Sequence, residues 1–190
     1  PVALASAVAG GLVLAGVAQA LTIGRGAITV SRKVVELPGL PAGLDGLRIV
    51  HLSDFHLASL PDGDLAGRLV AAVNGLQPDL IVFTGDLGAP EEVEAGPEIL
   101  GHLRAPLGGV AVLGNHDLVR PGAADDVAPS AEDKAIRTAR QRELLAARGF
   151  ALLHNGARLV ERSGGRLAVL GIAVQDPHHG LADADLPAAL

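Results

Sequence analysis

Three short apolar runs divide the middle of this chain into strands separated by helices. The runs lie within Leu47–Leu52, Asp79–Thr84 and Gly109–Leu113. Runs of this length that are rich in β-branched residues are typical of buried strands. The segments between them have apolar residues at helical spacing, so the pattern predicts a β-α-β-α-β order with parallel strands and right-handed crossovers.

The intervening and following segments predict three helices. Asp64 is expected to cap the first, whose apolar face continues to Leu76 before a Gln-Pro pair ends it. The second spans Glu91–Arg104 with a break near Pro97, and the third spans Glu132–Arg148. Together with the strands, these helices indicate an α/β fold.

A β-hairpin is predicted after the third helix. Two β-rich stretches, Ala157–Val160 and Arg166–Val174, are separated by the turn sequence Ser163-Gly164-Gly165. Such a hairpin would begin a second sheet layer with an uncovered apolar face. The 190-residue chain alone is therefore expected to be prone to aggregation and inactive.

The first 23 residues contain no charged side chain. Roughly 20 apolar residues span the hydrocarbon layer of a bilayer, and Val2–Ile23 just reaches that length. We therefore expect residues 1–23 to form a hydrophobic helix that anchors the protein in a membrane, with its sidedness open. Two alternatives remain: a secretory signal cleaved after Ala18-Gln19-Ala20, and a buried amphipathic helix of a soluble domain.

Residues 24–45 are interpreted as a connector with a leading strand. Ala27–Val30 and Lys33–Leu37 have β-branched strand character, and the stretch 38–43 is rich in Pro and Gly. The main domain is expected to cover residues 46–190.

Polar residues follow each of the three predicted strands at its carboxyl end. The set comprises Asp54, His56, Asp86, Asn115 and His116. Because the carboxyl ends of parallel strands meet at one edge of a sheet, and ligands bind at that edge in open α/β folds, we expect these side chains to converge. Oxygen and imidazole donors without a thiolate suit Mn²⁺, Fe or Zn²⁺.

Composition narrows the candidate functions. The net charge is −6 and no run of Lys or Arg occurs, which argues against nucleic acid as the principal partner. The chain has no Cys, so disulfides and thiolate nucleophiles are excluded.

In chain order the three polar clusters read Asp54-x-His56, Gly85-Asp86 and Gly114-Asn115-His116-Asp117. They resemble the opening signatures of the calcineurin-like metallophosphoesterases. The sequence of residues 46–54 is similar to that of the membrane-anchored bacterial branch of this superfamily. The resemblance runs from about Leu44 to the end of the chain. It implies a four-layer α/β/β/α sandwich, two divalent metal ions with Mn²⁺ favoured, and phosphoester or pyrophosphate hydrolysis by a metal-activated water.

The resemblance also implies a role for each residue. Asp54 and His56 would bind the first metal, Asp86 would bridge both metals, and Asn115 would bind the second. His116 would ligate neither metal, and would instead donate a hydrogen bond to the phosphate or protonate the leaving oxygen.

The sequence departs from the family pattern in one respect. The family completes its site with a later His and then a Gly-His-x-His motif, which this chain does not contain. His178-His179-Gly180 has the wrong spacing to replace it. We therefore expect residues 46–190 to be the N-terminal part of the catalytic domain, with the remaining His ligands beyond Leu190.

Several residues near the motifs keep two interpretations. Asp117 either orients the loop or His116, or is a simple turn residue. His51 is expected on the strand face opposite the ligands, and His154 is more simply explained as a lone His than as a ligand. The loop 121–129 is a candidate substrate-facing flap.

Two functions of different classes follow from these observations. The first is a membrane-anchored, two-metal phosphoesterase whose substrate is lipid-linked, an idea that rests on the anchor and on family analogy alone. The second is a non-catalytic, membrane-tethered binding module on the same fold. Three further His ligands after Leu190 would favour the enzyme.

Overall fold

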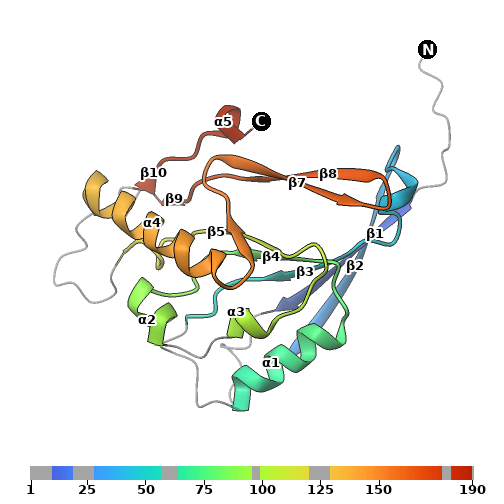
Figure 1. Ribbon diagram of the computed structural model, residues 1–190, viewed down its shortest axis with the longest axis horizontal. Helices are drawn as coiled ribbons and strands as arrows, with labels where there is room; N and C mark the ends of the chain where they lie inside the picture. The colour runs from blue at the N-terminus through green and yellow to red at the C-terminus, as the bar shows by residue number, and fades with distance from the viewer. Residues whose placement is uncertain are drawn as a thin grey trace.

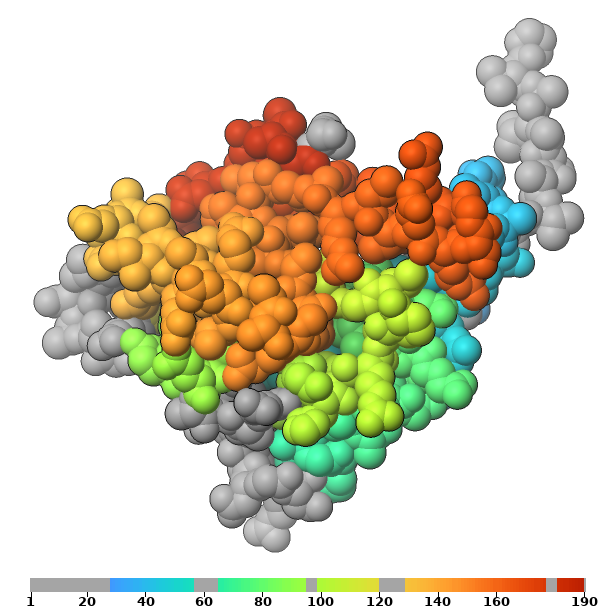
Figure 2. Space-filling view, viewed as in Figure 1, coloured from blue at the N-terminus to red at the C-terminus, as the bar shows by residue number. Residues whose placement is uncertain are grey.

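A six-stranded sheet carries helices on one face and a β-hairpin on the other (Figure 1). The computed structural model describes residues 10–18, 28–56, 64–95, 99–119, 129–176 and 181–189, with only the backbone described for 10–18. In the space-filling view, α4 and the hairpin cover much of the facing surface, and little of the parallel strands can be seen (Figure 2).

The sheet has the strand order β2-β1-β3-β4-β5-β6. Its strands are β1 (Gly10–Ala18), β2 (Thr29–Leu37), β3 (Arg48–Leu52), β4 (Leu80–Thr84), β5 (Gly109–Val112) and β6 (Phe150–Leu152). All neighbouring pairs from β1 through β3, β4 and β5 to β6 are parallel, and only β2 is antiparallel to its neighbour. The predicted parallel β-α-β-α-β core is confirmed, whereas the three-residue strand β6 was not predicted.

Helices cover one face of the sheet. They are α1 (Asp64–Gly75), α2 (Pro90–Ala95), α3 (Ile99–His102) and α4 (Ala131–Ala146). A short α5 (Leu186–Ala189) near the end of the chain lies on the hairpin side of the sheet (Figure 1). The second predicted helix is described as α2 and α3, and the expected break near Pro97 lies outside the described residues. Ser130 caps α4 by accepting the backbone N–H of Asp133 at 3.0 Å.

The main core lies between the sheet and α1 to α4. Val50 and Leu52 alternate along β3 toward these helices, and Ile81 and Phe83 do the same on β4. Phe83 meets Phe55 edge to face, with ring centroids 4.9 Å apart. Burial of this face anchors the carboxyl ends of the strands, from which the polar clusters emerge.

The hairpin packs on the opposite face of the sheet. It consists of β7 (Gly156–Arg162) and β8 (Gly165–Gly171), and its turn has Ser163 at φ 49° and Gly164 at φ 77°. Positive φ at both turn residues matches the twist of the two strands. Its Val160 joins Leu47, Ile49 and Leu80 in a second, smaller core. The predicted hairpin is therefore confirmed.

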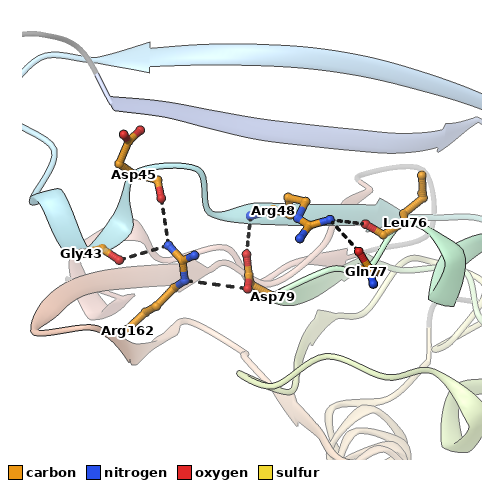
Figure 3. A network of polar contacts seen from close by, with 7 residues as sticks. All are labelled: Gly43, Asp45, Arg48, Leu76, Gln77, Asp79 and Arg162. Carbon is orange, nitrogen blue, oxygen red and sulfur yellow. Dashed lines mark hydrogen bonds and ion pairs between the residues drawn. The ribbon is translucent and has the colours of Figure 1, made fainter.

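A polar network fixes the hairpin to the amino ends of β3 and β4 (Figure 3). The Arg162 guanidinium donates to the carbonyls of Gly43, at 3.1 Å, and Asp45, at 2.9 Å. Its Nε lies 3.8 Å from Asp79, whose other carboxylate oxygen accepts the Arg48 N–H at 2.8 Å. The network lies at the edge of the sheet opposite to the polar clusters.

The described residues form three layers, namely helices, sheet and hairpin, of the expected four-layer α/β/β/α arrangement. Two-residue strands β9 (Gln175–Asp176) and β10 (Leu181–Ala182) pair separately. Leu159, Leu170 and Ile172 of the hairpin region are exposed, as expected for an uncovered apolar face.

The expected hydrophobic helix at the N-terminus needs correction. Gly10–Ala18 forms strand β1, which pairs along its whole length with β2 and over four residues with β3. Glycine has low helix propensity, and a strand here pairs the backbone on both of its sides. The rest of residues 1–23 lies outside the described residues. Among the helices that the structure describes, none is both long and apolar enough to cross a membrane.

Candidate metal centre

The polar clusters lie in three loops at the carboxyl ends of β3, β4 and β5. Two backbone hydrogen bonds connect the first loop to the second. Asp54 N–H donates to the Gly85 carbonyl at 3.0 Å, and His56 N–H donates to the Asp86 carbonyl at 2.9 Å. The first two motifs are therefore held side by side by their own backbone.

Three of the site residues have a backbone that non-glycine residues rarely adopt. Asp54, His56 and Asp86 have φ values of 57°, 44° and 57°. A left-handed backbone costs a non-glycine residue about 1 kcal/mol or more, and such residues gather at functional sites. These residues lie in the loops that follow β3 and β4, and their left-handed backbone changes the direction of the chain there.

Two glycines bring the second and third loops together. Gly85 has φ 95°, and a Cβ on it would overlap the backbone of Gly114. A Cβ on Gly114 would in turn overlap the carboxylate of Asp86. Each of the two motif glycines therefore permits a close approach that no other residue would allow.

His56, Asp86 and His116 converge on one point. One ligand atom from each can be chosen so that all three lie within 4.8 Å of one another. The two imidazoles meet edge to face, with centroids 4.7 Å apart and an angle of 80° between the rings. All three residues are half-buried, so a small cation could reach them from solvent.

Hydrogen bonds orient the carboxylates around this point. Asp86 Oδ1 accepts the backbone N–H of His116 at 2.9 Å, which ties the second loop to the third. The Ser53 hydroxyl donates to Asp54, whose carboxylate is not part of the group of three. Asn115 is half-buried, and its carbonyl accepts the N–H groups of Leu118 and Val119.

Asp117 is buried, with 1% of its surface exposed, and its carboxylate connects two loops of the site. Its carboxylate accepts backbone N–H groups of Asp86 at 2.9 Å, Gly88 at 2.9 Å and Gly114 at 2.8 Å. Burial raises the pKa of Asp117 to about 6, against the lowering effect of these hydrogen bonds, and the charge of Asp86 raises it further. Of its two interpretations, the contacts favour the one that orients the loop.

Gln141 supports the same loop from α4, a role that the sequence pattern did not predict. Its side chain is fully buried, and Nε2 donates to the Gly88 carbonyl at 2.8 Å. Its sequence signal is a polar residue on the apolar face of a predicted helix, because a buried amide needs a hydrogen-bond partner.

The other histidines of interest lie apart from this group. His51 faces the hairpin side of the sheet, as expected, with Nε2 2.6 Å from the Thr84 hydroxyl. His154 follows β6 and lines a separate cavity beside α4. His178 and His179, and the loop 121–128, lie outside the described residues.

The donors present fit a divalent cation. Two imidazoles and a carboxylate converge, and Gly114, which has no Cβ, leaves room for the Asp86 carboxylate beside the third loop. Asp54 and Asn115 lie in the same loops and would add oxygen donors. A mixed set of nitrogen and oxygen ligands suits Mn²⁺, Fe and Zn²⁺.

Comparison with known proteins identifies the family. Residues 47–180 match the family described as calcineurin-like phosphoesterase. This match covers more than half of the chain and includes every loop of the candidate metal centre. The chain belongs to this family. It is a family of metal-binding hydrolases, which agrees with the resemblance found in the three motifs.

Several curated relatives are similar to the chain. It is 46% identical over 95 residues to "UDP-2,3-diacylglucosamine pyrophosphatase LpxG" of Chlamydia trachomatis, covering 47% of this chain and 28% of the relative. It is 37% identical over 160 residues to "Transmembrane protein with metallophosphoesterase domain" of Danio rerio, covering 77% and 33%. It is 30% identical over 130 residues to the uncharacterized metallophosphoesterase YkuE of Bacillus subtilis, covering 66% and 40%.

The chain spans less than half the length of each of these relatives. No solved structure matches it significantly. The comparisons therefore establish the family of this metallophosphoesterase chain, and they place the motif loops inside the matched region.

Proposed function

We propose that this metallophosphoesterase hydrolyses phosphoester or pyrophosphate bonds with two divalent metal ions. The convergence of His56, Asp86 and His116 at the carboxyl edge of the sheet carries the proposal. Two such ions, when bound, neutralise the phosphoryl oxygens and supply a nucleophilic water at neutral pH.

The roles that we propose for the residues are those that the family resemblance implies. Asp54 and His56 would hold one ion, Asp86 would bridge, and Asn115 would hold the other. Asp86 is suited to bridging because the N–H of His116 fixes one of its oxygens and so sets the direction of the carboxylate. By the same resemblance, His116 would donate a hydrogen bond or a proton to the substrate and would not bind an ion; its ring lies edge to face against that of His56.

A lipid-linked pyrophosphate is the substrate class that we propose. The relative with 46% identity is named for hydrolysis of UDP-2,3-diacylglucosamine, a molecule that bears acyl chains. The part of the chain that it matches contains less than half of the residues. We extend the substrate class of this relative to the present protein.

We also propose that the full-length protein associates with a membrane. The name of the Danio rerio relative supports this, and residues 1–9, which precede strand β1, have no charged side chain. Cell fractionation tests the association, and a full-length protein that stays in the supernatant without detergent would contradict it. A variant that lacks residues 1–9 keeps strand β1, so loss of membrane association in this variant would assign the association to residues 1–9.

Metal-dependent turnover of an aryl phosphodiester by the full-length protein is the decisive test. We expect hydrolysis of bis(p-nitrophenyl) phosphate with Mn²⁺, and loss of that activity after exhaustive chelation. Activity that survived chelation would contradict the mechanism. Bound Mn²⁺ without turnover of any phosphoester or pyrophosphate would favour the non-catalytic binding module.

A further inference from the structure

A cavity of about 450 Å³ lies between α4 and the segments that follow β6 and β10. Four charged or titratable side chains line it: Lys134, Arg142, His154 and Asp183. Cavities of this size hold small organic ligands. None of these four residues belongs to the candidate metal centre.

The cavity is open because α4 presents small side chains to it. Ala131, Ala135 and Ala139 follow one another at intervals of four residues and therefore lie on one face of the helix. Arg142 lies on this same face, three residues after Ala139, and Lys134 lies to one side of it, eight residues or about 12 Å of helix before Arg142. The helix thus combines an apolar floor with a cation toward each end.

The charges of the cavity are unbalanced. The Lys134 ammonium pairs with Asp183 at 2.8 Å. Arg142 donates from Nη1 to the Leu152 carbonyl at 3.1 Å, and a guanidinium has five N–H donors in all. Burial lowers the pKa of His154; Asp183 opposes this, and Arg142 and Lys134 reinforce it. Two cations therefore face one carboxylate.

We propose that this cavity binds an anionic oxygen group, a phosphate or a carboxylate, through Arg142 and Lys134 beside His154. A planar guanidinium with free N–H groups binds such oxygens in pairs. The alanine floor would contact the uncharged part of the ligand. Anion binding here does not depend on the proposed hydrolysis.

The cavity shares a wall with the third loop of the metal centre. Leu118 lines it, and the Leu118 N–H donates to the Asn115 carbonyl at 3.0 Å. Arg137 of α4 donates to the Leu118 carbonyl at 2.6 Å. The anion is consequently either a second charged group of the substrate held at the metal centre or a separate molecule such as free phosphate.

Titration of the full-length protein with inorganic phosphate tests the site. Excess chelator keeps the metal centre from contributing, and NMR follows the His154 imidazole and the Thr138 amide in the cavity wall. We expect saturable shifts at both, and about tenfold weaker phosphate binding in Arg142→Gln and in Lys134→Gln. The thermal midpoint of each variant verifies that it is folded.

Arg140→Gln is the matched control. Arg140 lies on the same helix, is exposed, and pairs with Glu94 and Glu143 outside the cavity. Its phosphate affinity is expected to stay within about twofold of the wild type. No saturable shift in the wild type at millimolar phosphate, or an equal loss in Arg140→Gln and Arg142→Gln, would overturn the proposal.

Steady-state kinetics distinguish the two sources of the anion. This test rests on the proposed function, because it requires turnover of a phosphodiester. If the anion is part of the substrate, Arg142→Gln raises KM for an aryl phosphodiester that bears a carboxylate and not for its methyl ester. If it is a separate molecule, both KM values stay unchanged while phosphate binding is lost. Both outcomes agree with an anion site. If no substrate is turned over, the phosphate titration still decides whether the site exists.

Discussion

The carboxylate of Asp117 accepts the backbone N–H of Asp86 at 2.9 Å, across 31 positions of the sequence. The residue proposed to bridge two metals is thereby held by the last residue of the third motif. Since the same carboxylate also accepts N–H groups of Gly88 and Gly114, one buried side chain fixes the relative position of two loops.

Asp117→Asn is expected to lower the free energy of unfolding by about 2–3 kcal/mol and to weaken Mn²⁺ binding. The Asn amide has one acceptor oxygen, so its NH₂ group must face at least one of the three N–H donors. Denaturant unfolding and metal titration measure the two effects. Glu161→Gln makes the same change at an exposed position and should leave both unchanged; equal behaviour of the two variants would contradict the role of Asp117.

Gly114→Ala should abolish tight metal binding, because its Cβ would overlap the carboxylate and backbone N of Asp86. Calorimetric titration with Mn²⁺ measures this loss. Gly67→Ala in α1 is the control, since a Cβ there has open space around it. The control should be neutral or stabilising by about 0.5–1 kcal/mol, and unaltered metal binding in Gly114→Ala would show that the loops do not approach closely.

Asp86→Asn and His116→Gln should fail in different ways. Asp86→Asn is expected to lose metal and activity together, because the bridging charge is removed. His116→Gln is expected to keep its metal and to lose kcat by about 10²- to 10⁴-fold, the usual contribution of a proton donor. Metal analysis and steady-state kinetics separate the two, with His102→Gln as an exposed control. Loss of metal in His116→Gln would make His116 a ligand, as its position beside His56 and Asp86 also permits.

Arg162→Met is expected to lower the free energy of unfolding by about 1–2 kcal/mol without changing metal affinity. The variant loses the hydrogen bonds to Gly43 and Asp45, which lie at the far edge of the sheet (Figure 3). Arg166→Met, exposed on the neighbouring strand, should change stability by less than about 0.5 kcal/mol. A reduced metal affinity in Arg162→Met would mean that the hairpin also supports the metal centre.

His154 should make stability depend on pH below 6.5. Burial lowers its pKa in the folded protein below the usual 6.5, so the unfolded chain binds the proton more readily. The contribution of His154 is complete above pH 6.5 and is lost as the pH falls through that value toward the folded pKa. Denaturant unfolding between pH 7.5 and about 5 should show a smaller decline for His154→Gln than for the wild type and for His102→Gln; parallel declines in all three would contradict the shift.

Local pattern was sufficient for most of the parallel core. The runs around Val50, Ile81 and Val110 are short and β-branched, and helical spacing between them required parallel pairing. The hairpin was likewise predictable, because Ser163-Gly164 accepts the positive φ values of its turn. The motif residues followed from strand ends, since parallel strands bring their carboxyl ends together.

Local pattern failed where pairing partners decide the conformation. Gly10–Ala18 lies in an apolar stretch that is long enough for a membrane helix, yet it forms a strand because β2 and β3 pair with it on both sides. The three residues of β6 are too few to show a period, and they become a strand only by pairing with β5.

The sequence by itself determined which loops carry the candidate donors, because these loops begin where the strands end, and His56, Asp86 and His116 from them converge. Only the tertiary structure decided how those donors are held. In sequence, Asp117 could be a turn residue or a residue that orients the loop. In the structure its carboxylate accepts the N–H groups of Asp86, Gly88 and Gly114, which favours the second role. Gln141 and Arg142 are ordinary helix residues in sequence, and their contacts depend on how α4 packs on the sheet. Hydrogen bonds between residues far apart in the chain, such as Asp86 with Asp117 and Gly88 with Gln141, leave no periodic trace in a sequence, since they are set by packing in three dimensions.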